Sequence, residues 1–483
     1  MTPPLRVLSV TSEISPLVKT GGLGDVTGAL PAALAAKGVE VRSLVPGYPG
    51  VTAALQGAAA VHSVPDLFGG PARVLEGKAA GLHLFCIEAP HLYHRPGTPY
   101  GQPDGTDFPD NPQRFAALAQ MAAAIGLGAA GSFAPDVVHG HDWHAGLAPA
   151  YLHYAGTARP ATAMTIHNLA FQGRFPATLL RALGLPPASF DVNGVEYYGG
   201  IGFLKAGLRL ADAITTVSPT YAAEICTPEG GMGLDGLLRT RSGALAGILN
   251  GIDTTVWDPG ADVHLAAEFG GHRLRRRPRN KAALQARLGL APDPDALLFG
   301  VVSRLTRQKG MDLLLDALPA LLGHGAQLAV LGSGEPALQG GFAAAASAHP
   351  GRIGMLAGFD EDLAHLIQGG CDALLVPSRF EPCGLTQLCA LRYGAVPVVA
   401  HVGGLVDTVI DANPAAQAAE VATGIQFAPV TTAGLEHAIA RTVRLWQEPK
   451  AWARMQRNGM RGNYGWDVPA AEYAALYRTL RRH

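Results

Sequence analysis

The sequence has few charged residues and almost no excess of either sign. Only 16% of its 483 residues are charged, and the formal net charge is −1. A chain this close to neutral has no general attraction for nucleic acid or for acidic membranes. An anionic ligand must therefore be held by a few local cations, and we expect neither nucleic acid nor a membrane among the partners.

Cysteine is also scarce. The five cysteines are odd in number and include no CxxC pair, which argues against both a disulfide framework and a structural zinc site. The first residues lack the charged segment and apolar segment of a secretory signal, so we expect a cytoplasmic protein. The apolar stretch 115–134 is interrupted by Gln120 and several glycines, which favours a buried helix over a membrane span.

The length and the pattern of apolar residues predict two α/β domains. In the first half, short β-branched runs alternate with Ala/Leu-rich helical segments, which indicates a parallel sheet with strands at 6–11, 39–45, 82–87, 137–141, 162–167, 213–218 and 245–250. The alternation starts afresh with strands at 297–303, 328–331, 353–356, 373–376 and 396–400. We therefore predict two doubly wound, Rossmann-like domains, one of residues 1–255 joined by the C-terminal helix 466–483, the other of residues 256–465.

The segment between the two alternating regions is expected to be a linker. It contains turn residues at 257–260 and a basic run at 273–279, followed by a helix at 281–288. The run is short and poor in aromatic residues. We therefore expect a solvated basic surface at 273–279 rather than a nucleic-acid patch.

A glycine-rich segment, residues 19–26, lies between the first predicted strand and a helix expected at 27–37. It contains Lys19, three glycines and Asp25. Glycines let the backbone approach an anion closely, and the amides at the start of the following helix favour negative charge. This predicts a phosphate-binding loop, although a tight turn with an exposed lysine would have the same sequence.

The second domain repeats this arrangement after its first strand. Arg304 follows the strand, and Lys309 and Gly310 open the next helix. A cation at a helix N-terminus is unfavourable against the helix dipole, so its presence there favours a function. A guanidinium and an ammonium together suit a pyrophosphate and can take the place of a divalent metal.

Glu381 lies in another strand-to-helix segment, residues 378–386. Its carboxylate is suited to accept hydrogen bonds from sugar hydroxyls, while the amides at the start of the helix hold an anion; a simple helix cap is the alternative.

The histidines of the segment 139–144 have no metal-binding HExxH spacing, and Gly332–Gly334 is weak support for a dinucleotide. We predict no metal and no cofactor.

These segments together resemble the bacterial glycogen synthases and the related starch synthases, glycosyltransferases of the GT-B fold. The likeness runs almost from end to end of the chain. It depends on the following segments: 12–13 with 19–26, 141–146, 165–168, 215–221, 247–253, 303–310 and 377–388.

The resemblance implies two domains facing each other across a cleft, and transfer of glucose from ADP-glucose to the non-reducing end of an α-1,4-glucan such as glycogen, with retention of anomeric configuration. It assigns the diphosphate to Lys19, Gly21, Gly22, Arg304 and Lys309, the nucleotide to Asp25 and Phe359, the phosphate-facing helix start to Gly384, Leu385 and Thr386, the glucose to His167, Asn168, Asn250, Glu381 and Cys383, and the reacting centre to Asp142. The residues expected to be catalytic are Glu381, His167, Lys309, Arg304 and Asp142.

Three positions depart from the family pattern. Cys389 replaces a glutamate that many GT-B families use, His94 replaces a common aspartate, and Phe359 replaces a frequent tyrosine.

The alternatives to this function are a transferase of the same fold with another donor, such as UDP-glucose, a catalytically silent glucan-binding relative, and, last, a dehydrogenase. For retention, a carboxylate nucleophile and a same-face attack both remain open.

Overall fold

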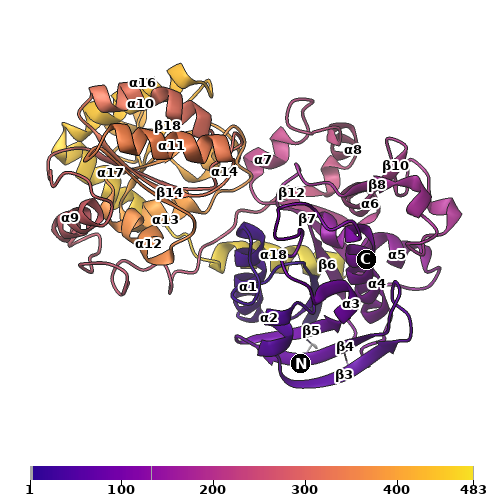
Figure 1. Cartoon of the computed structure of the whole chain (residues 1–483). Helices are drawn as coiled ribbons and strands as arrows, with labels where there is room; N and C mark the ends of the chain where they lie inside the picture. Colours follow the sequence, from indigo (N-terminus) through magenta and orange to yellow (C-terminus); the bar gives the residue numbers. More distant parts are fainter. Residues whose placement is uncertain (1–3, 132, 482–483) are drawn as a thin grey trace. The chain divides into compact units, whose positions relative to one another are not determined.

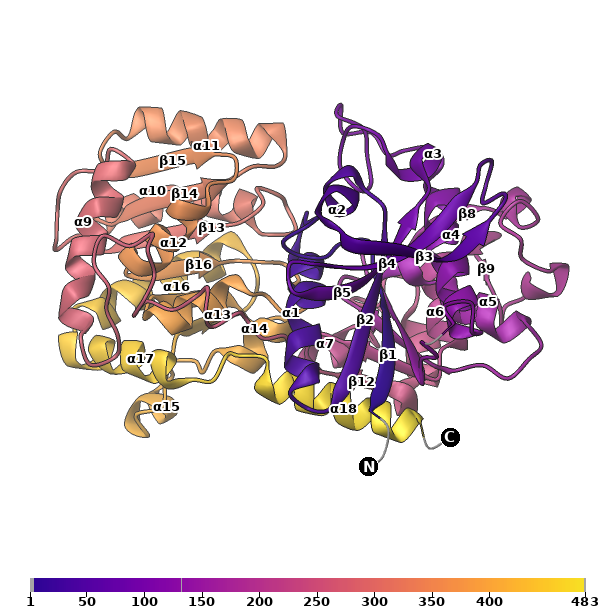
Figure 2. The ribbon, with the colours of Figure 1, turned by 90° about the horizontal axis from the view of Figure 1, so that it is seen from below.

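The computed structural model describes residues 4–131 and 133–481, and its contacts divide the chain into two units, each drawn in Figures 1 and 2. Unit 1 comprises Met1–Asn250 and Trp466–His483, and unit 2 comprises Gly251–Gly465. The change of unit falls between residues 250 and 251, not between 255 and 256. The contacts of Ile252 place it with unit 2. Its amide donates to the Tyr464 carbonyl (2.8 Å), and its side chain packs with Leu388 and Cys389.

Unit 1 is built on a nine-stranded sheet with the order β12 (Leu245–Gly247), β11 (Ala213–Thr216), β7 (Ala161–Ile166), β6 (Val137–His141), β1 (Leu5–Val10), β2 (Val39–Pro46), β5 (Leu82–Glu88), β4 (Ala72–Ala79) and β3 (Gln56–Val64). The strands from β12 to β5 are parallel, as predicted. The last two, β4 and β3, are antiparallel and were not predicted. The two-residue turn Ala80–Gly81 connects β4 to β5 as a hairpin, and both of its residues have positive φ (49° and 78°).

The helices of unit 1 are α1 (Gly22–Ala35), α2 (Pro49–Ala54), α3 (Pro90–Tyr93), α4 (Asn111–Gly126), α5 (Ala148–Tyr154), α6 (Phe203–Leu210), α7 (Pro219–Glu224), α8 (Asp235–Thr240) and α18 (Asp467–Leu480). The expected start of α1 at residue 27 was wrong: the helix begins at Gly22, so Gly22 and Gly24 lie in its first turn. Most of α4 is buried, as predicted for this apolar segment. Among the described residues, no helix is both long and apolar enough to span a membrane.

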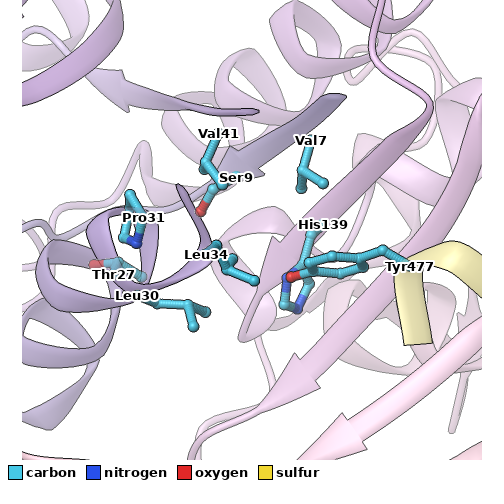
Figure 3. A pocket seen from close by; sticks show the side chains of 9 residues that line it. All are labelled: Val7, Ser9, Thr27, Leu30, Pro31, Leu34, Val41, His139 and Tyr477. Atoms are coloured by element: carbon cyan, nitrogen blue, oxygen red, sulfur yellow. The ribbon is translucent and has the colours of Figure 1, made fainter. Parts of the chain in front are cut away.

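The C-terminal helix α18 packs on unit 1, beside α1 (Figure 2). Tyr473 and Tyr477 join Val7, Leu30 and Val137 in one apolar cluster on a face of the sheet. Figure 3 shows the small pocket at this contact, where the Tyr477 ring lies beside His139. The Tyr477 hydroxyl hydrogen-bonds His139 Nδ1 (2.7 Å), so helix α18 is attached to β6, an inner strand of the sheet.

A second, three-stranded sheet in unit 1 was not predicted. It has the order β8 (Arg174–Pro176), β10 (Gly200–Gly202) and β9 (Glu196–Tyr197), all antiparallel. Its strands are too short to give an alternating pattern in the sequence. The sheet adjoins the start of α6, where the Phe203 amide donates to the Gly173 carbonyl (2.9 Å).

Unit 2 contains a six-stranded parallel sheet with the order β15 (Ile353–Ala357), β14 (Gln327–Gly332), β13 (Leu298–Val302), β16 (Ala373–Val376), β17 (Val396–Ala400) and β18 (Ile425–Phe427). Its helices are α9 (Arg277–Arg287), α10 (Met311–Gly323), α11 (Pro336–Ala348), α12 (Glu361–Gly370), α13 (Thr386–Tyr393), α14 (Gly403–Thr408), α15 (Pro414–Ala418), α16 (Thr432–Trp446) and α17 (Pro449–Arg461). The strand order reverses between β13 and β16, and ligands of open α/β sheets bind at such a switch point.

The basic run 273–279 is not simply a solvated surface. Helix α9 begins at Arg277, earlier than expected, and this side chain is buried. Its guanidinium donates to the carbonyl oxygens of Tyr393, Gln368 and Cys371. Arg277 therefore ties α9 to the ends of α12 and α13, a structural role that the composition of the run does not reveal.

We predict that Tyr477→Phe destabilises unit 1 by about 1–3 kcal/mol, because it leaves a ring nitrogen of buried His139 without its hydrogen bond. Hydrogen exchange of peptides covering β6 measures the effect. Val468→Ala, at an exposed position of the same helix, is the control and should change the free energy of unfolding by less than about 0.5 kcal/mol. Equal β6 protection in the two variants would contradict the prediction.

Candidate active site

In unit 2, the predicted residues gather where two neighbouring strands end. The loop after β13 contains Arg304 and Lys309, and the loop after β16 contains Glu381. The two loops touch through their backbones. The Arg379 amide donates to the Gln308 carbonyl (2.9 Å), and a Cβ on Gly310, whose φ is +68°, would lie 1.9 Å from the Pro377 carbonyl oxygen. Only glycine permits this approach.

Lys309 and Glu381 form an ion pair at the contact between these loops. Lys309 Nζ lies 2.5 Å from Glu381 Oε2, which also accepts a hydrogen bond from the Ser378 hydroxyl (2.9 Å). Only 7% of the Glu381 side chain is exposed, so the carboxylate is fixed. Arg304 is exposed and its guanidinium donates to Gln308 Oε1 (3.2 Å), which leaves most of its N–H donors facing solvent.

The segment that follows Glu381 is held by a third loop, which sequence reasoning missed. The Gly404 amide, at the start of α14, donates to the Glu381 carbonyl (3.0 Å), and a Cβ on Gly404 would lie 2.4 Å from the Cys383 carbonyl oxygen. Gly403 and Gly404 follow the strand β17 and begin a helix. This is the same order of strand, glycine and helix that predicted the other two loops, and it could have predicted this one. Gly384, Leu385 and Thr386 lie half-buried at the start of α13.

The other unit 2 positions differ in exposure. Phe359 follows β15 and is 80% exposed, so one face of its ring is available for stacking. Cys383 is buried and lies two positions after Glu381 in the sequence. Cys389 lies inside α13 and packs in the apolar cluster with Ile252, which explains why an apolar side chain occupies that position.

In unit 1, the glycine-rich loop is organised by a carboxylate that sequence reasoning did not include in the site. Glu13 accepts hydrogen bonds from the Thr20 amide (2.6 Å), the Thr20 hydroxyl (2.6 Å) and the Gly21 amide (3.2 Å), and also from the Tyr100 hydroxyl. Lys19 is partly exposed and forms an ion pair with Asp25 (2.7 Å). In the sequence Glu13 belongs to segment 12–13 of the family resemblance, but its role is not visible there, because the contacts that define it form on folding.

Asp142 lies at the end of β6 in a strained backbone conformation. Its φ and ψ are 56° and −174°, a region that residues other than glycine rarely occupy and that costs about 1–3 kcal/mol. The conformation lets Oδ1 accept from the amides of His167 (2.7 Å) and Asn168 (3.4 Å), which begin the loop after β7. Burial raises the pKa of Asp142 to about 7, although these amides act in the opposite direction.

The histidines of β6 form hydrogen bonds to protein groups. His141 Nδ1 lies 3.0 Å from His167 Nε2, and Ser9 Oγ lies 3.2 Å from His141 Nε2, so His141 orients the His167 ring. His139 bonds Tyr477 and Thr165. Desolvation lowers the pKa of His139 and of His167 to about 3, so both rings are neutral at pH 7.

Two further residues, the predicted Asn250 and the family departure His94, lie apart from these clusters. Asn250 is buried at the end of unit 1, and within the described residues its Oδ1 has no hydrogen-bond partner. His94 is exposed after α3. The structure therefore brings together Lys309 with Glu381, and Asp142 with His167 and Asn168, each within its own unit.

One group of possible metal ligands occurs in the described part of the chain: Asp262, His264 and His365, all in unit 2. Several of their ligand atoms already have partners, but His365 Nε2 is buried and has no hydrogen-bond partner among the described residues. Asp262 Oδ2 accepts from His365 Nδ1 (2.7 Å) and from the Tyr393 hydroxyl (2.5 Å), and His264 Nδ1 lies 2.7 Å from Asp362. This group contains none of the predicted site residues.

The chain matches two family models. Residues 6–240 match the starch synthase catalytic domain, and residues 285–459 match the glycosyl transferases group 1. Among curated relatives, the glycogen synthase of Acidiphilium cryptum (strain JF-5) is 63% identical over 477 residues, which is 99% of each chain. The glycogen synthase of Methylocella silvestris is 62% identical over 478 residues and covers the same shares.

Solved structures agree with these matches. The catalytic domain of starch synthase IV from Arabidopsis thaliana, bound to ADP and acarbose, has a TM-score of 0.90 and 31% identity, and the match covers 99% of this chain and 100% of that one. The sucrose-phosphate synthase of Thermosynechococcus elongatus, at a TM-score of 0.60 and 17% identity, shows the fold alone. The predicted GT-B fold class is confirmed, and the chain belongs to the glycogen synthase and starch synthase family of glycosyltransferases.

Proposed function

We propose that this chain transfers the glucosyl group of ADP-glucose to the non-reducing 4-OH of an α-1,4-glucan, with retention of anomeric configuration, in glycogen synthesis in the cytoplasm. Beyond family membership, the supporting observation is the pairing of Lys309 with buried Glu381 beside exposed Arg304, at the switch point of the unit 2 sheet. A solvent-facing cation next to a fixed carboxylate suits a ligand that is anionic at one end and a sugar at the other.

Unit 2 is proposed to hold the donor. Breaking the glycosyl–phosphate bond builds negative charge on the departing diphosphate, so cations placed beforehand stabilise the transition state more than the ground state. Arg304 has N–H donors that face solvent, and the Lys309 ammonium has three donors, of which Glu381 and its surroundings use only part. The half-buried helix start at Gly384, Leu385 and Thr386 would meet phosphate oxygens, and Phe359 would stack on the base.

Glu381 and Cys383 are proposed to contact the glucose. Glu381 uses Oε2 for Lys309 and Ser378, and its other oxygen is suited to accept from sugar hydroxyls. Because the carboxylate is held on two sides, it would orient the sugar without moving. Lys309 thus has two roles, since it fixes Glu381 and faces the leaving group.

Unit 1 is proposed to supply the remaining contacts. Lys19, Gly21 and Gly22 would bind the diphosphate, with Asp25 near the nucleotide, on a loop that Glu13 holds in place. Asp142 would lie at the reacting centre, with His167, Asn168 and Asn250 around the glucose. A neutral His167 is suited to hydrogen-bond a sugar hydroxyl, and the raised pKa of Asp142 suits a carboxyl group that exchanges a proton near pH 7. A nucleophilic carboxylate and a same-face attack remain alternatives for retention.

The direct test is incorporation of label into polymer. Purified protein and glycogen are incubated with radiolabelled ADP-glucose or, in parallel, UDP-glucose, and the polymer is counted. We expect incorporation from ADP-glucose. Incorporation from UDP-glucose alone would show that UDP-glucose, not ADP-glucose, is the donor. Incorporation from neither donor, by a protein that still binds glycogen, would favour a silent glucan-binding relative.

We predict that Arg304→Ala or Lys309→Ala lowers kcat/KM at least about a hundredfold, which corresponds to roughly 2.7 kcal/mol of lost transition-state stabilisation. Arg304→Ala is the cleaner variant, because Lys309→Ala also leaves buried Glu381 without its cation. Arg307→Ala is the matched control: this cation of the same loop is exposed and lies 3.7 Å from Asp312. Near-normal rates for Arg304→Ala would refute its assignment.

We also predict that activity survives treatment with EDTA, because the cationic side chains of Lys19, Arg304 and Lys309 balance the charge of the diphosphate. Initial rates are compared after dialysis against chelator, with and without added magnesium. A strict requirement for magnesium would contradict this account of the leaving group.

A further inference from the structure

Two tight turns in unit 1 carry residues that their geometry disfavours. Tyr198 and Gly199 connect β9 to β10 as a two-residue loop, and their φ angles are +47° and +75°. Met232 and Gly233 lie between Gly231 and Leu234, whose amide donates to the Gly231 carbonyl (2.8 Å), and their φ angles are +48° and +88°. Positive φ at both central residues is the type I′ arrangement, which strongly prefers Asn, Asp or Gly at the first position.

The disfavoured residues are also exposed. Tyr198 is 67% and Met232 is 37% accessible to solvent, so neither is explained by packing in the core. Asn at either position would relieve the backbone, and an exposed polar side chain would be the ordinary choice there. A bulky apolar side chain in a left-handed turn at the surface is a local conflict of the kind that marks a functional position.

The two turns lie against each other. A Cβ on Gly233 would be 3.0 Å from the Tyr197 hydroxyl and 3.4 Å from the ring of Tyr198. The Gln172 side chain donates to the Met232 carbonyl (3.0 Å), which attaches the same corner to the preceding loop. Phe171, next to Gln172, is 50% exposed. Phe171, Tyr198 and Met232 thus belong to one corner of unit 1, which we call the apolar corner.

The apolar corner is continuous with the candidate active site. The Phe171 amide donates to the Asn168 carbonyl (3.3 Å), so Phe171 lies one turn from the residue whose own amide contacts Asp142. None of the three side chains carries a charge, and the charged neighbours Arg174 and Glu196 are bonded to the backbone of the Tyr198 turn, so the surface suits a largely uncharged partner. A pyranose ring has apolar C–H faces and a rim of hydroxyls, which match an aromatic ring with amide and phenol groups at its edge.

We propose that Phe171, Tyr198 and Met232 form a platform that binds the α-glucan chain beyond the sugar that reacts. This rests on the proposed function, since it assigns the polymer to unit 1. Tyr198 provides the main stacking surface, and the strained turns hold it and Met232 out of the core.

The test uses Tyr198→Asn, Met232→Asn and the double variant in the full-length chain. Asn suits both turns, so we expect thermal stability to be equal or higher while glycogen binding weakens. Affinity electrophoresis in gels containing glycogen measures binding without any donor, and initial rates give KM for glycogen and for ADP-glucose. We expect the double variant to raise the dissociation constant and KM for glycogen at least about fivefold and to leave KM for ADP-glucose unchanged.

Two control variants show whether the lost binding comes from the ring and its place in the apolar corner. Tyr198→Phe keeps the ring and should retain affinity for glycogen, and Val192→Asn replaces an exposed apolar residue outside the apolar corner and should also retain it. A rise of less than about fivefold for the double variant, or an equal loss in Val192→Asn, would overturn the platform. Failure of the native protein to incorporate glucose would instead overturn the proposed function, because the gel measures the platform independently.

Discussion

The adjacency of β13 and β16 is the constraint on which the candidate donor site depends. These strands pair in parallel, with Phe299 opposite Ala373, so the loops that follow them leave the same edge of the sheet. The backbone contact at Gly310 then brings the loops within van der Waals distance. Lys309 and Glu381, which are 72 positions apart in sequence, meet at 2.5 Å as a consequence. The ion pair is therefore a product of sheet order and of one glycine.

Carboxylates organise the candidate site differently in the two units. In unit 2, Glu381 is held by a cation and a hydroxyl, and it stays beside a charge that a ligand can share. In unit 1, Glu13 and Asp142 accept hydrogen bonds from backbone amides, and in this way each of them also holds a loop. The hydrogen bonds to Glu13 offset the cost of burying its charge, whereas for Asp142 burial outweighs the two amides and raises the pKa. The loops of unit 1 are therefore ordered before any ligand binds.

The sequence predicted what local patterns determine. Parallel strands and the loops that follow them were visible because β-branched runs and glycine-to-helix transitions are local, and the strand-end positions of Lys309, Glu381 and Asp142 followed from them. The roles of Glu13, His141 and Arg277 were not visible, because each depends on partners that only the folded chain brings close. The start of α1 was misplaced because two glycines, poor helix formers, lie in a first turn that the loop contacts of Glu13 support.

The positions where local preference and fold disagree are informative around the candidate site. Asp142 adopts a conformation that favours glycine, and it lies where two strand-end loops are joined. Tyr198 and Met232 occupy turn positions that favour asparagine, and they lie one loop away from Asn168. Sequence patterns alone do not mark these residues, since a tyrosine before a glycine is unremarkable until the φ angle is known. Strained residues persist where the surrounding structure holds them, and these three are held around the end of β7 and the loop that follows it.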